Sequence, residues 1–315
     1  MPGACSVRSL RALYNAGVIA ALRRLPRLVL LAAHLTSGAA LALFALPLVG
    51  EPARDRIIAR WSRRLLAILR VRVHIETSPA LPDGALLVCN HVSWIDIYLI
   101  LAARRVRFVS KSEVRRWPLI GWLAQRVGTL FLERGRRADT RRINAEMGAL
   151  MQTGHWVAVF PEGTTSDGRS LRRFLPSLLQ PAVALDCPVV PAALRYRTPD
   201  GRYSAAPAYI DDISLWTSVT RILDAGGLVA ELRFGAPIPP DGHRRELAAA
   251  AERAVAGLLD AVPARGTPPD ARPTGGLGAA PARSTPPDAR PTGGLGAAPA
   301  GSPPRTPADP PAAPR

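Results

Sequence analysis

Two short apolar segments constrain the fold of this chain more than any other feature, because each ends directly in a polar motif. The first, residues 84–89, precedes the heptapeptide Asn-His-Val-Ser-Trp-Ile-Asp at 90–96, and the second, residues 156–160, precedes Pro-Glu-Gly-Thr at 161–164. Apolar runs of this length predict strands buried on both faces. In open α/β sheets, ligands bind beyond the carboxyl ends of the strands, which is where both motifs would lie.

Strand and helix patterns alternate through the middle of the chain. Strand patterns lie near residues 71–75, 85–89, 106–109, 128–132, 156–160, 188–194 and 229–234, and helix patterns near 94–103, 138–152, 177–185 and 243–259. This alternation predicts one α/β domain with a mostly parallel or mixed sheet flanked by helices.

The spacing of His91 and Asp96 favours a strand, a turn and a helix over one continuous helix. Residues five apart lie about 140° apart around a helix and do not share a face. If Ser93 is the N-cap, however, His91 lies on the turn and Asp96 in the first helical turns, where the two side chains can meet. A carboxylate on one imidazole nitrogen fixes the tautomer and leaves the other nitrogen free to accept a proton.

This pair predicts a general base and its orienting residue, although a structural histidine beside a surface aspartate is the alternative. Ser93 is the only nucleophile in the motif and is better explained as the cap. Without an enzyme nucleophile, the histidine would activate a hydroxyl group on the substrate.

The second motif predicts a polar turn after a buried strand. Pro161 ends the strand because a proline cannot continue a hydrogen-bonded ladder. Residues 162–168 follow as a polar stretch with two glycines that can adopt positive φ. Taken alone, this segment fits either a site or a structural turn.

Taken together, these motifs resemble those of the glycerolipid acyltransferase family, which contains the 1-acylglycerol-3-phosphate acyltransferases. Asn90, His91 and Asp96 match the family's H-x-x-x-x-D block, and residues 160–164 match its F-P-E-G-T block at every position. Residues 128–134 resemble a block that leads from glycine to arginine, and residues 189–192 resemble a fourth, apolar and proline-containing block. The resemblance covers about residues 86–194, with the four blocks in the family's order.

The resemblance implies acyl transfer from a thioester, acyl-CoA or acyl carrier protein, to the free hydroxyl of a lysophospholipid. The first choice of acceptor is 1-acyl-sn-glycerol 3-phosphate, which would give phosphatidate. His91 would be the general base and Asp96 its orienter, with no covalent acyl-enzyme, no cofactor and no metal.

The resemblance also implies a set of substrate-binding residues from the second and third blocks. Arg134 would hold the acceptor's phosphate, since a guanidinium fork matches phosphate oxygens. Glu162 cannot contact a phosphate favourably, so we assign it to orienting a neighbouring donor or the glycerol hydroxyl. Gly163, Thr164 and Phe131 complete this set.

Two departures from the family pattern leave the head group open. Thr165 occupies the position where many members have arginine, and Leu175 follows Phe174 where many have lysine or arginine. Arg172 and Arg173 are candidate substitutes. The alternative acceptor is a lyso-ornithine lipid.

Lys111 is the only lysine among 41 basic residues. A compact ammonium donor to a phosphate would explain a lysine at this position, and chance at a surface position explains it equally well. Its place between the first two blocks favours a substrate-binding role.

The N-terminal region predicts a membrane anchor. Residues 28–50 carry no charged side chain, and at about 1.5 Å per residue they suffice to cross a hydrocarbon core of about 30 Å. A half-inserted or buried helical hairpin is the alternative. Arginines flank both ends, so the charge bias does not set the orientation. The implied reaction places the enzyme at the inner membrane, with its catalytic domain facing the cytoplasm.

Two further segments have apolar patterns that fit either a membrane surface or the core. Residues 54–70 alternate apolar residues and arginines at helical spacing, which suits a helix on anionic lipid or a core-facing helix. Residues 117–123 form an apolar cluster that suits membrane docking, an acyl-chain surface or ordinary core.

A net charge of +17 calls for an anionic partner or surface. Membrane lipids and acidic acyl carriers meet that need. A membrane-anchored nucleic-acid-binding protein is the rival, but the arginines are scattered, aromatic residues make up only 5% and no nucleic-acid motif occurs. A metal hydrolase is disfavoured because the five histidines lack a second close ligand. Three isolated cysteines indicate a reducing compartment.

The C-terminal segment predicts disorder. A 16-residue sequence beginning at Thr267 is repeated without change at Thr285, and Pro, Gly and Ala dominate to the end. We therefore assign residues 1–50 to the membrane anchor, 51–262 to the acyltransferase domain and 263–315 to a disordered tail.

Overall fold

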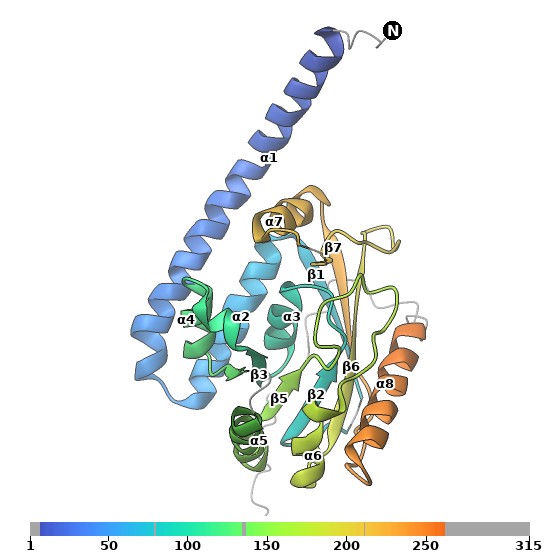
Figure 1. Ribbon diagram of the computed structural model, residues 1–315. Coiled ribbons are helices and arrows are strands. Elements are labelled where there is room, and N and C mark those ends of the chain that lie inside the picture. Colours follow the sequence, from blue (N-terminus) through green and yellow to red (C-terminus); the bar gives the residue numbers. More distant parts are fainter. Residues whose placement is uncertain (1–6, 79, 134–136, 211, 262–315) are drawn as a thin grey trace, which may run out of the picture. The chain divides into compact units, whose positions relative to one another are not determined.

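The fold centres on a seven-stranded sheet with strand order β1-β7-β6-β2-β5-β3-β4. The computed structural model describes residues 7–78, 80–133, 137–210 and 212–261 (Figure 1). The strands are β1 (Val71–Thr77), β2 (Ala85–Cys89), β3 (Val106–Lys111), β4 (Leu130–Leu132), β5 (Trp156–Val159), β6 (Val189–Arg197) and β7 (Leu228–Phe234). All neighbouring strands are parallel except β6 and β7, which confirms the predicted mostly parallel or mixed sheet.

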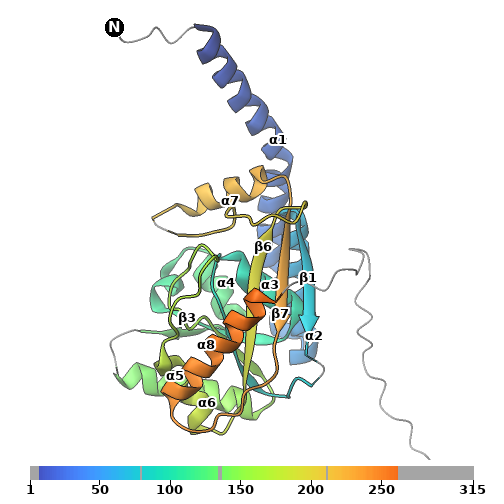
Figure 2. The same ribbon diagram turned by 90° about the vertical axis from the view of Figure 1, so that its right-hand side faces the viewer.

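Helices cover both faces of the sheet (Figures 1 and 2). Core residues of α2 (Glu51–Ile68), α3 (Ile95–Ala103) and α7 (Leu215–Asp224) pack on one face, and those of α5 (Arg137–Gln152), α6 (Gln180–Ala184) and α8 (Arg244–Asp260) on the other. Successive residues of β2 alternate between these two cores, with Leu87 in one and Leu86 and Val88 in the other. The continuous apolar run of β2 thus reflects burial on both faces.

One predicted helix needed correction, and other elements differ from the sequence pattern. The helix expected at 177–185 is divided into a 3₁₀ turn, Pro176–Leu178, and α6, because Pro181 lacks an N–H group and lies in the first turn of a new helix. The pattern did not predict α7. The cluster at 117–123 is not core: Trp117 and Leu119 are 43% and 44% exposed, just before α4 (Ile120–Arg126).

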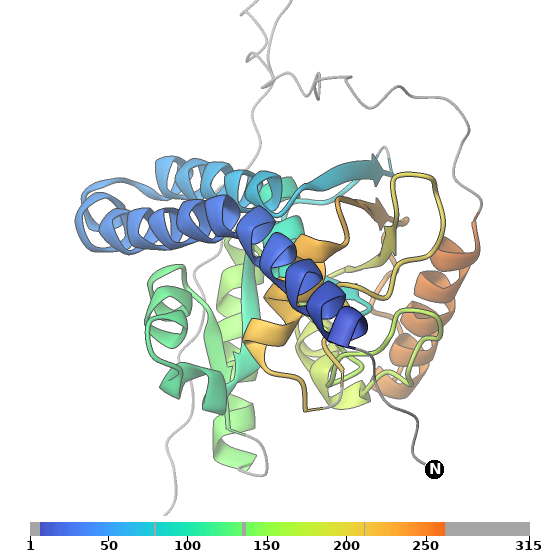
Figure 3. The ribbon, with the colours of Figure 1, turned by 90° about the horizontal axis from the view of Figure 1, so that it is seen from above.

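The N-terminal helix is longer than the apolar run predicted and folds back on its neighbour. α1 spans Val7–Ala40, and residues 24–48 form a segment long and apolar enough to cross a membrane, with mean hydropathy 2.0. After a π-helical turn at Leu41–Ala45 and a 3₁₀ turn at Leu46–Leu48, the chain reverses and α2 lies beside α1 (Figure 3). α1 and α2 therefore form a helical hairpin, and the apolar segment 24–48 lies in its first arm and the turn.

A clasp between His34 and Trp61 holds this hairpin together. The two rings stack with centroids 4.4 Å apart. Trp61 Nε1 donates to the His34 carbonyl at 3.2 Å, and His34 Nε2 donates to the Trp61 carbonyl at 3.1 Å. Gly38 allows the close approach, because a Cβ atom there would lie 2.8 Å from the Trp61 ring.

An ion-pair cluster fixes α2 to the sheet. Arg107 of β3 donates to Asp55 at 3.0 Å and to Glu51 at 2.5 Å, and both Arg107 and Asp55 are buried. Leu65 and Leu66 of α2 are also buried. The core-facing interpretation of residues 54–70 is therefore confirmed.

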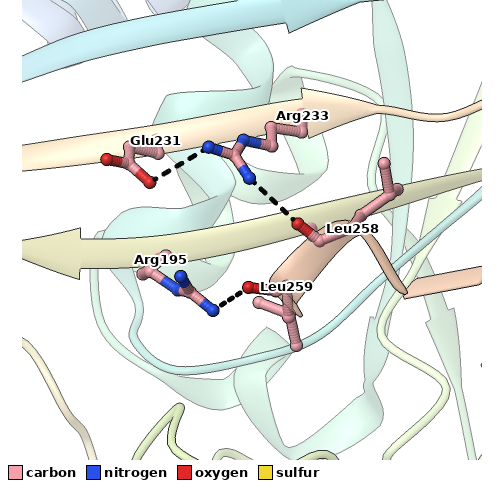
Figure 4. Close-up of a pocket in the computed structure, with 6 residues that line it drawn as sticks. Arg195, Glu231, Arg233, Leu258 and Leu259 are labelled. Carbon is pink, nitrogen blue, oxygen red and sulfur yellow. Dashed lines mark hydrogen bonds and ion pairs between the residues drawn. The ribbon is translucent and has the colours of Figure 1, made fainter. Parts of the chain in front are cut away.

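Arginines from the sheet hold the C-terminal end of α8 (Figure 4). Arg233 donates to the carbonyl of Leu258 at 3.2 Å, and Arg195 donates to that of Leu259. Cations at a helix C-terminus satisfy its free carbonyl groups and oppose its dipole. The small pocket drawn in Figure 4 is lined by these residues, and its arginines are engaged in contacts that stabilise the fold. The predicted tail, residues 263–315, lies outside the described residues.

Candidate active site

The structure brings His91 and Asp96 together at the carboxyl end of β2. His91 lies on the loop between β2 and α3, and Asp96 lies in the first turn of α3. Nδ1 of His91 is 2.9 Å from Oδ2 of Asp96. The aspartate side chain is fully buried, whereas that of the histidine is 19% exposed. Among the described residues, no hydrogen bond reaches Nε2.

Asp96 also holds the loop that carries His91. Its Oδ2 atom accepts hydrogen bonds from the backbone N–H groups of Val92, at 2.7 Å, and Ser93, at 2.8 Å. A carboxylate oxygen accepts only, so Nδ1 of His91 donates this hydrogen bond, and in the neutral ring Nε2 is then the acceptor. The spacing of the motif thus produces the tautomer that a general base needs.

The prediction that Ser93 caps the helix is wrong. Trp94 occupies the N-cap position, and the Ser93 hydroxyl is buried without a hydrogen-bond partner among the described residues. The Asp96 carboxylate reaches the loop amides instead. A charged acceptor bonds to N–H groups more strongly than a hydroxyl does.

The sequence did not identify Tyr196 as part of this site. The hydroxyl of this β6 residue donates to Oδ1 of Asp96 at 2.5 Å, and both side chains are buried. Burial and the neighbouring carboxylate raise the pKa of Tyr196 well above its usual range. The one available signal was its place on β6, two residues after Leu194 on the same core face.

Asn90 joins the first motif to β6. Its side-chain amide donates to the carbonyl of Leu194 at 3.0 Å, and its side-chain oxygen accepts from the N–H of Leu194 at 2.7 Å. The amide side chain thus continues the ladder between β2 and β6 past the end of β2. This contact fixes the point at which the loop leaves the sheet.

The second motif supports the backbone of His91. Oε1 of Glu162 accepts from the N–H of His91 at 2.7 Å, and Oε2 accepts from the N–H of Arg172 at 3.0 Å. The N–H of Ser166 donates to the carbonyl of His91 at 2.8 Å. Burial raises the pKa of Glu162, against the two backbone bonds and the charge of Arg172, which lower it. The carboxylate of Glu162 therefore bridges two loops.

The ring of His91 stacks on Phe160, the residue before this motif. The ring centroids are 3.9 Å apart and the ring planes differ by 8°. Glu162 and Ser166 hold the backbone of His91, Asp96 binds its Nδ1 atom, and Phe160 packs on its ring. These contacts together fix the position of the imidazole. The two motifs predicted at strand ends meet at one site.

The other predicted substrate-binding residues lie along the same edge or outside the described part. Lys111 is exposed at the end of β3, in register with Leu132, and Phe131 is half-buried on β4. Gly163 has φ +74°, and Thr164 is exposed. Arg134 lies outside the described residues.

Thr165 has a structural contact where many family members carry an arginine. Its hydroxyl donates to the carbonyl of Tyr209, whose own N–H donates to the carbonyl of Val92 at 2.9 Å. Arg172 and Arg173 are exposed on the following loop. The side chain at position 165 is therefore neutral, and its hydroxyl is engaged in a contact within the protein.

Neither of the two nucleophilic side chains nearest to His91 in the sequence is accessible. Ser93 is fully buried, and Cys89 is 1% exposed. Burial, together with the charges of Asp96 and Glu162, raises the pKa of the Cys89 thiol well above its usual range. These two residues are poorly placed to form an acyl-enzyme.

Comparisons with known proteins agree with this geometry. Residues 70–195 match the family model named Acyltransferase. The chain is 40% identical to the lyso-ornithine lipid O-acyltransferase of Pseudomonas aeruginosa over 206 residues, 65% of this chain and 78% of that protein. It is 35% identical to the 1-acyl-sn-glycerol-3-phosphate acyltransferase of Neisseria meningitidis serogroup B over 182 residues, 58% of this chain and 71% of that protein.

A solved structure shows the same fold. The crystal structure of the 1-acyl-sn-glycerophosphate acyltransferase of Thermotoga maritima aligns with a TM-score of 0.52 at 24% identity. The alignment covers 76% of this chain and 99% of that one.

Proposed function

The chain belongs to the glycerolipid acyltransferase family, and from that membership we propose that this O-acyltransferase of lysolipids acylates a lyso-ornithine lipid. The acyl donor is a thioester, acyl-CoA or acyl carrier protein. The sequence motifs favoured 1-acyl-sn-glycerol 3-phosphate as the acceptor. The similarity of the chain to the Pseudomonas aeruginosa enzyme supports the alternative acceptor, a lyso-ornithine lipid, better.

The neutral side chain of Thr165 is the main structural support for this choice of head group. Many family members have an arginine here, and a guanidinium binds a phosphate well. In this chain the side chain is neutral and its hydroxyl is engaged with the Tyr209 carbonyl. An ornithine head group carries a carboxylate and an ammonium group instead of a phosphate, so it needs less positive charge at this position.

The proposed reaction uses His91 as the base. The acceptor hydroxyl gives its proton to Nε2 as its oxygen attacks the thioester carbonyl, and the carbonyl oxygen takes the negative charge of the tetrahedral intermediate. The C–S bond then breaks, and the leaving thiolate takes the proton back from the imidazolium. The Asp96 carboxylate stabilises that imidazolium through Nδ1.

We expect the purified enzyme to prefer lyso-ornithine lipid over 1-acyl-sn-glycerol 3-phosphate by about tenfold or more in kcat/KM, because a site built for one polar group discriminates against another. The two acceptors are compared in mixed micelles of one composition, with the same acyl donor. The variant Thr165→Arg should use 1-acyl-sn-glycerol 3-phosphate better, so its preference for lyso-ornithine lipid should be smaller. Thr165→Val, which replaces the hydroxyl with a methyl group and adds no charge, should keep the wild-type preference.

A wild-type preference for 1-acyl-sn-glycerol 3-phosphate would overturn the assignment. That acceptor is the second candidate, because the chain is 35% identical to the Neisseria meningitidis enzyme and Arg172 and Arg173 offer positive charge near the site. In that case Thr165→Arg would raise an activity that is already dominant.

We also propose that the enzyme works at the inner membrane with its catalytic domain on the cytoplasmic side, where acyl thioesters are available. One N-terminal apolar helix supports membrane association. The turn between α1 and α2 exposes Leu43, Phe44 and Leu48, the last at 85%. A net charge of +17 favours an anionic leaflet.

Substituting both Leu43 and Phe44 with Asp should release the protein from vesicles that contain anionic lipid, because two apolar side chains would be replaced by charges that lipid disfavours. Flotation on a density gradient measures the bound fraction. Ile75→Asp, at an exposed apolar position on edge strand β1, is the matched control and should float like the wild type. Equal flotation of the turn variant and the control would contradict insertion of this turn.

A further inference from the structure

We propose that Tyr196 is a positioning residue for acyl transfer: by binding Oδ1 of Asp96, it aims Oδ2 of the same carboxylate at His91. This inference rests on the proposed role of His91 as the base. It concerns a residue of β6 that lies 100 positions from Asp96 in the sequence and outside the four sequence blocks.

The division of hydrogen bonds on Asp96 is the first support. Oδ2 accepts from Nδ1 of His91 and from the N–H groups of Val92 and Ser93. Among the described residues, only Tyr196 donates to Oδ1. Without this hydroxyl, a buried carboxylate oxygen would lack a partner, and the carboxylate could rotate and share its oxygens differently among the three remaining donors.

The rigidity of β6 is the second support. Leu194 exchanges two hydrogen bonds with Asn90, which immediately precedes His91. Tyr196 lies two residues further along on the same face of the strand and holds Asp96. One strand therefore fixes both ends of the loop that carries the base. Side chains on strands are better held than side chains on loops.

The Tyr196 hydroxyl also reduces the negative charge on Oδ2 of Asp96. A donor on Oδ1 draws negative charge from Oδ2, so its removal would strengthen the attraction between Oδ2 and a protonated His91. The base must be unprotonated to work, and a stronger attraction keeps the proton on the ring to higher pH. The acid limb of kcat/KM should therefore move to higher pH when the hydroxyl is lost.

The other ionisable groups near Asp96 and His91 are the same in the wild type and in the Tyr196 variants. Cys89 and Glu162 are buried beside the site, and Arg172 lies next to Glu162. Tyr196 remains protonated through the working range, because its burial beside Asp96 raises its pKa. Changes in the acid limb thus report the Asp96–His91 pair.

Tyr196→Phe is the direct test. We expect kcat to fall about tenfold, as for loss of a hydrogen bond to a charged group, with the KM values of donor and acceptor within about twofold of wild type. The acid limb of kcat/KM should move up by about half a pH unit to one unit. Tyr98→Phe is the matched control: it removes a hydroxyl from the helix that carries Asp96, and that hydroxyl makes no hydrogen bond with a described residue.

A second variant covers the case in which Tyr196→Phe folds poorly. Incorporation of 3-fluorotyrosine at position 196 keeps the side chain and makes its hydroxyl a stronger donor. The acid limb should then move in the opposite direction, to lower pH.

An acid limb that stays in place in both variants would overturn the inference, even if the thermal midpoint falls, because a purely structural tyrosine changes stability alone. Full activity of a His91→Ala enzyme would instead remove the proposed base itself. The two failures are therefore distinguishable.

Discussion

His91→Ala should lose a factor of about 10² to 10⁴ or more in kcat, the usual contribution of a general base, while the protein stays folded. The side chain has one bonded nitrogen and a partly exposed ring, so its removal leaves the rest of the site in place. The backbone contacts of residue 91 with Glu162 and Ser166 do not depend on the imidazole. The expected defect is therefore in turnover and not in structure.

Initial rates at saturating donor and acceptor measure this loss, and thermal unfolding checks the fold. His74→Ala, a half-buried histidine on edge strand β1, is the matched control and should keep near-normal turnover. Acid quenching during turnover followed by mass spectrometry of the intact protein tests the direct transfer. A trapped acyl group on a serine or cysteine, or near-normal turnover without His91, would refute the mechanism.

The sequence predicted the parts of the site that local chain geometry determines. The spacing between His91 and Asp96 excludes a shared helix face, so the strand, the turn and the helix that join them could be derived. Pro161 marked the end of β5 in the same way. Strands buried on both faces are nearly uniform apolar runs, which made β2 and β5 recognisable.

Competition between equivalent polar groups was harder to predict. Ser93 has the right chemistry for an N-cap, but Asp96 is also within reach of the same amides and accepts from them as a charged group. Glu162 was predicted to orient a neighbouring donor or the glycerol hydroxyl. In the structure its carboxylate accepts from two backbone amides, including that of His91.

Long-range contacts left almost no trace in the sequence. Tyr196 meets Asp96 only because β6 lies beside β2, and strand order is not encoded in any local pattern. The contacts that hold α1 against α2 are a similar case. Hydropathy registers that residues 28–50 are apolar, but the fold-back depends on His34 and Gly38 meeting Trp61.

Asp96→Asn should reduce kcat by about 10³-fold or more and leave the loop largely intact, because the amide can replace the carboxylate as an acceptor but not as a charge. With its oxygen at the Oδ2 position, the amide still accepts from Val92, Ser93 and His91. Its NH₂ group then faces Tyr196, whose hydroxyl can turn and accept. What disappears is the negative charge that stabilises the imidazolium formed during the reaction.

Comparing Asp96→Asn with Asp96→Ala distinguishes the effect of the negative charge from the effect of the hydrogen bonds that hold the loop. The alanine variant leaves two buried backbone N–H groups without a partner, which costs about 1–3 kcal/mol each, so its free energy of unfolding should fall well below that of Asp96→Asn. Both variants should show similarly low turnover if the charge is what matters. Denaturant unfolding and initial rates, measured on the same preparations, give the comparison. If Asp96→Asn kept turnover within about tenfold of wild type while Asp96→Ala lost it, the carboxylate would serve to hold the loop, and the base would not need its charge.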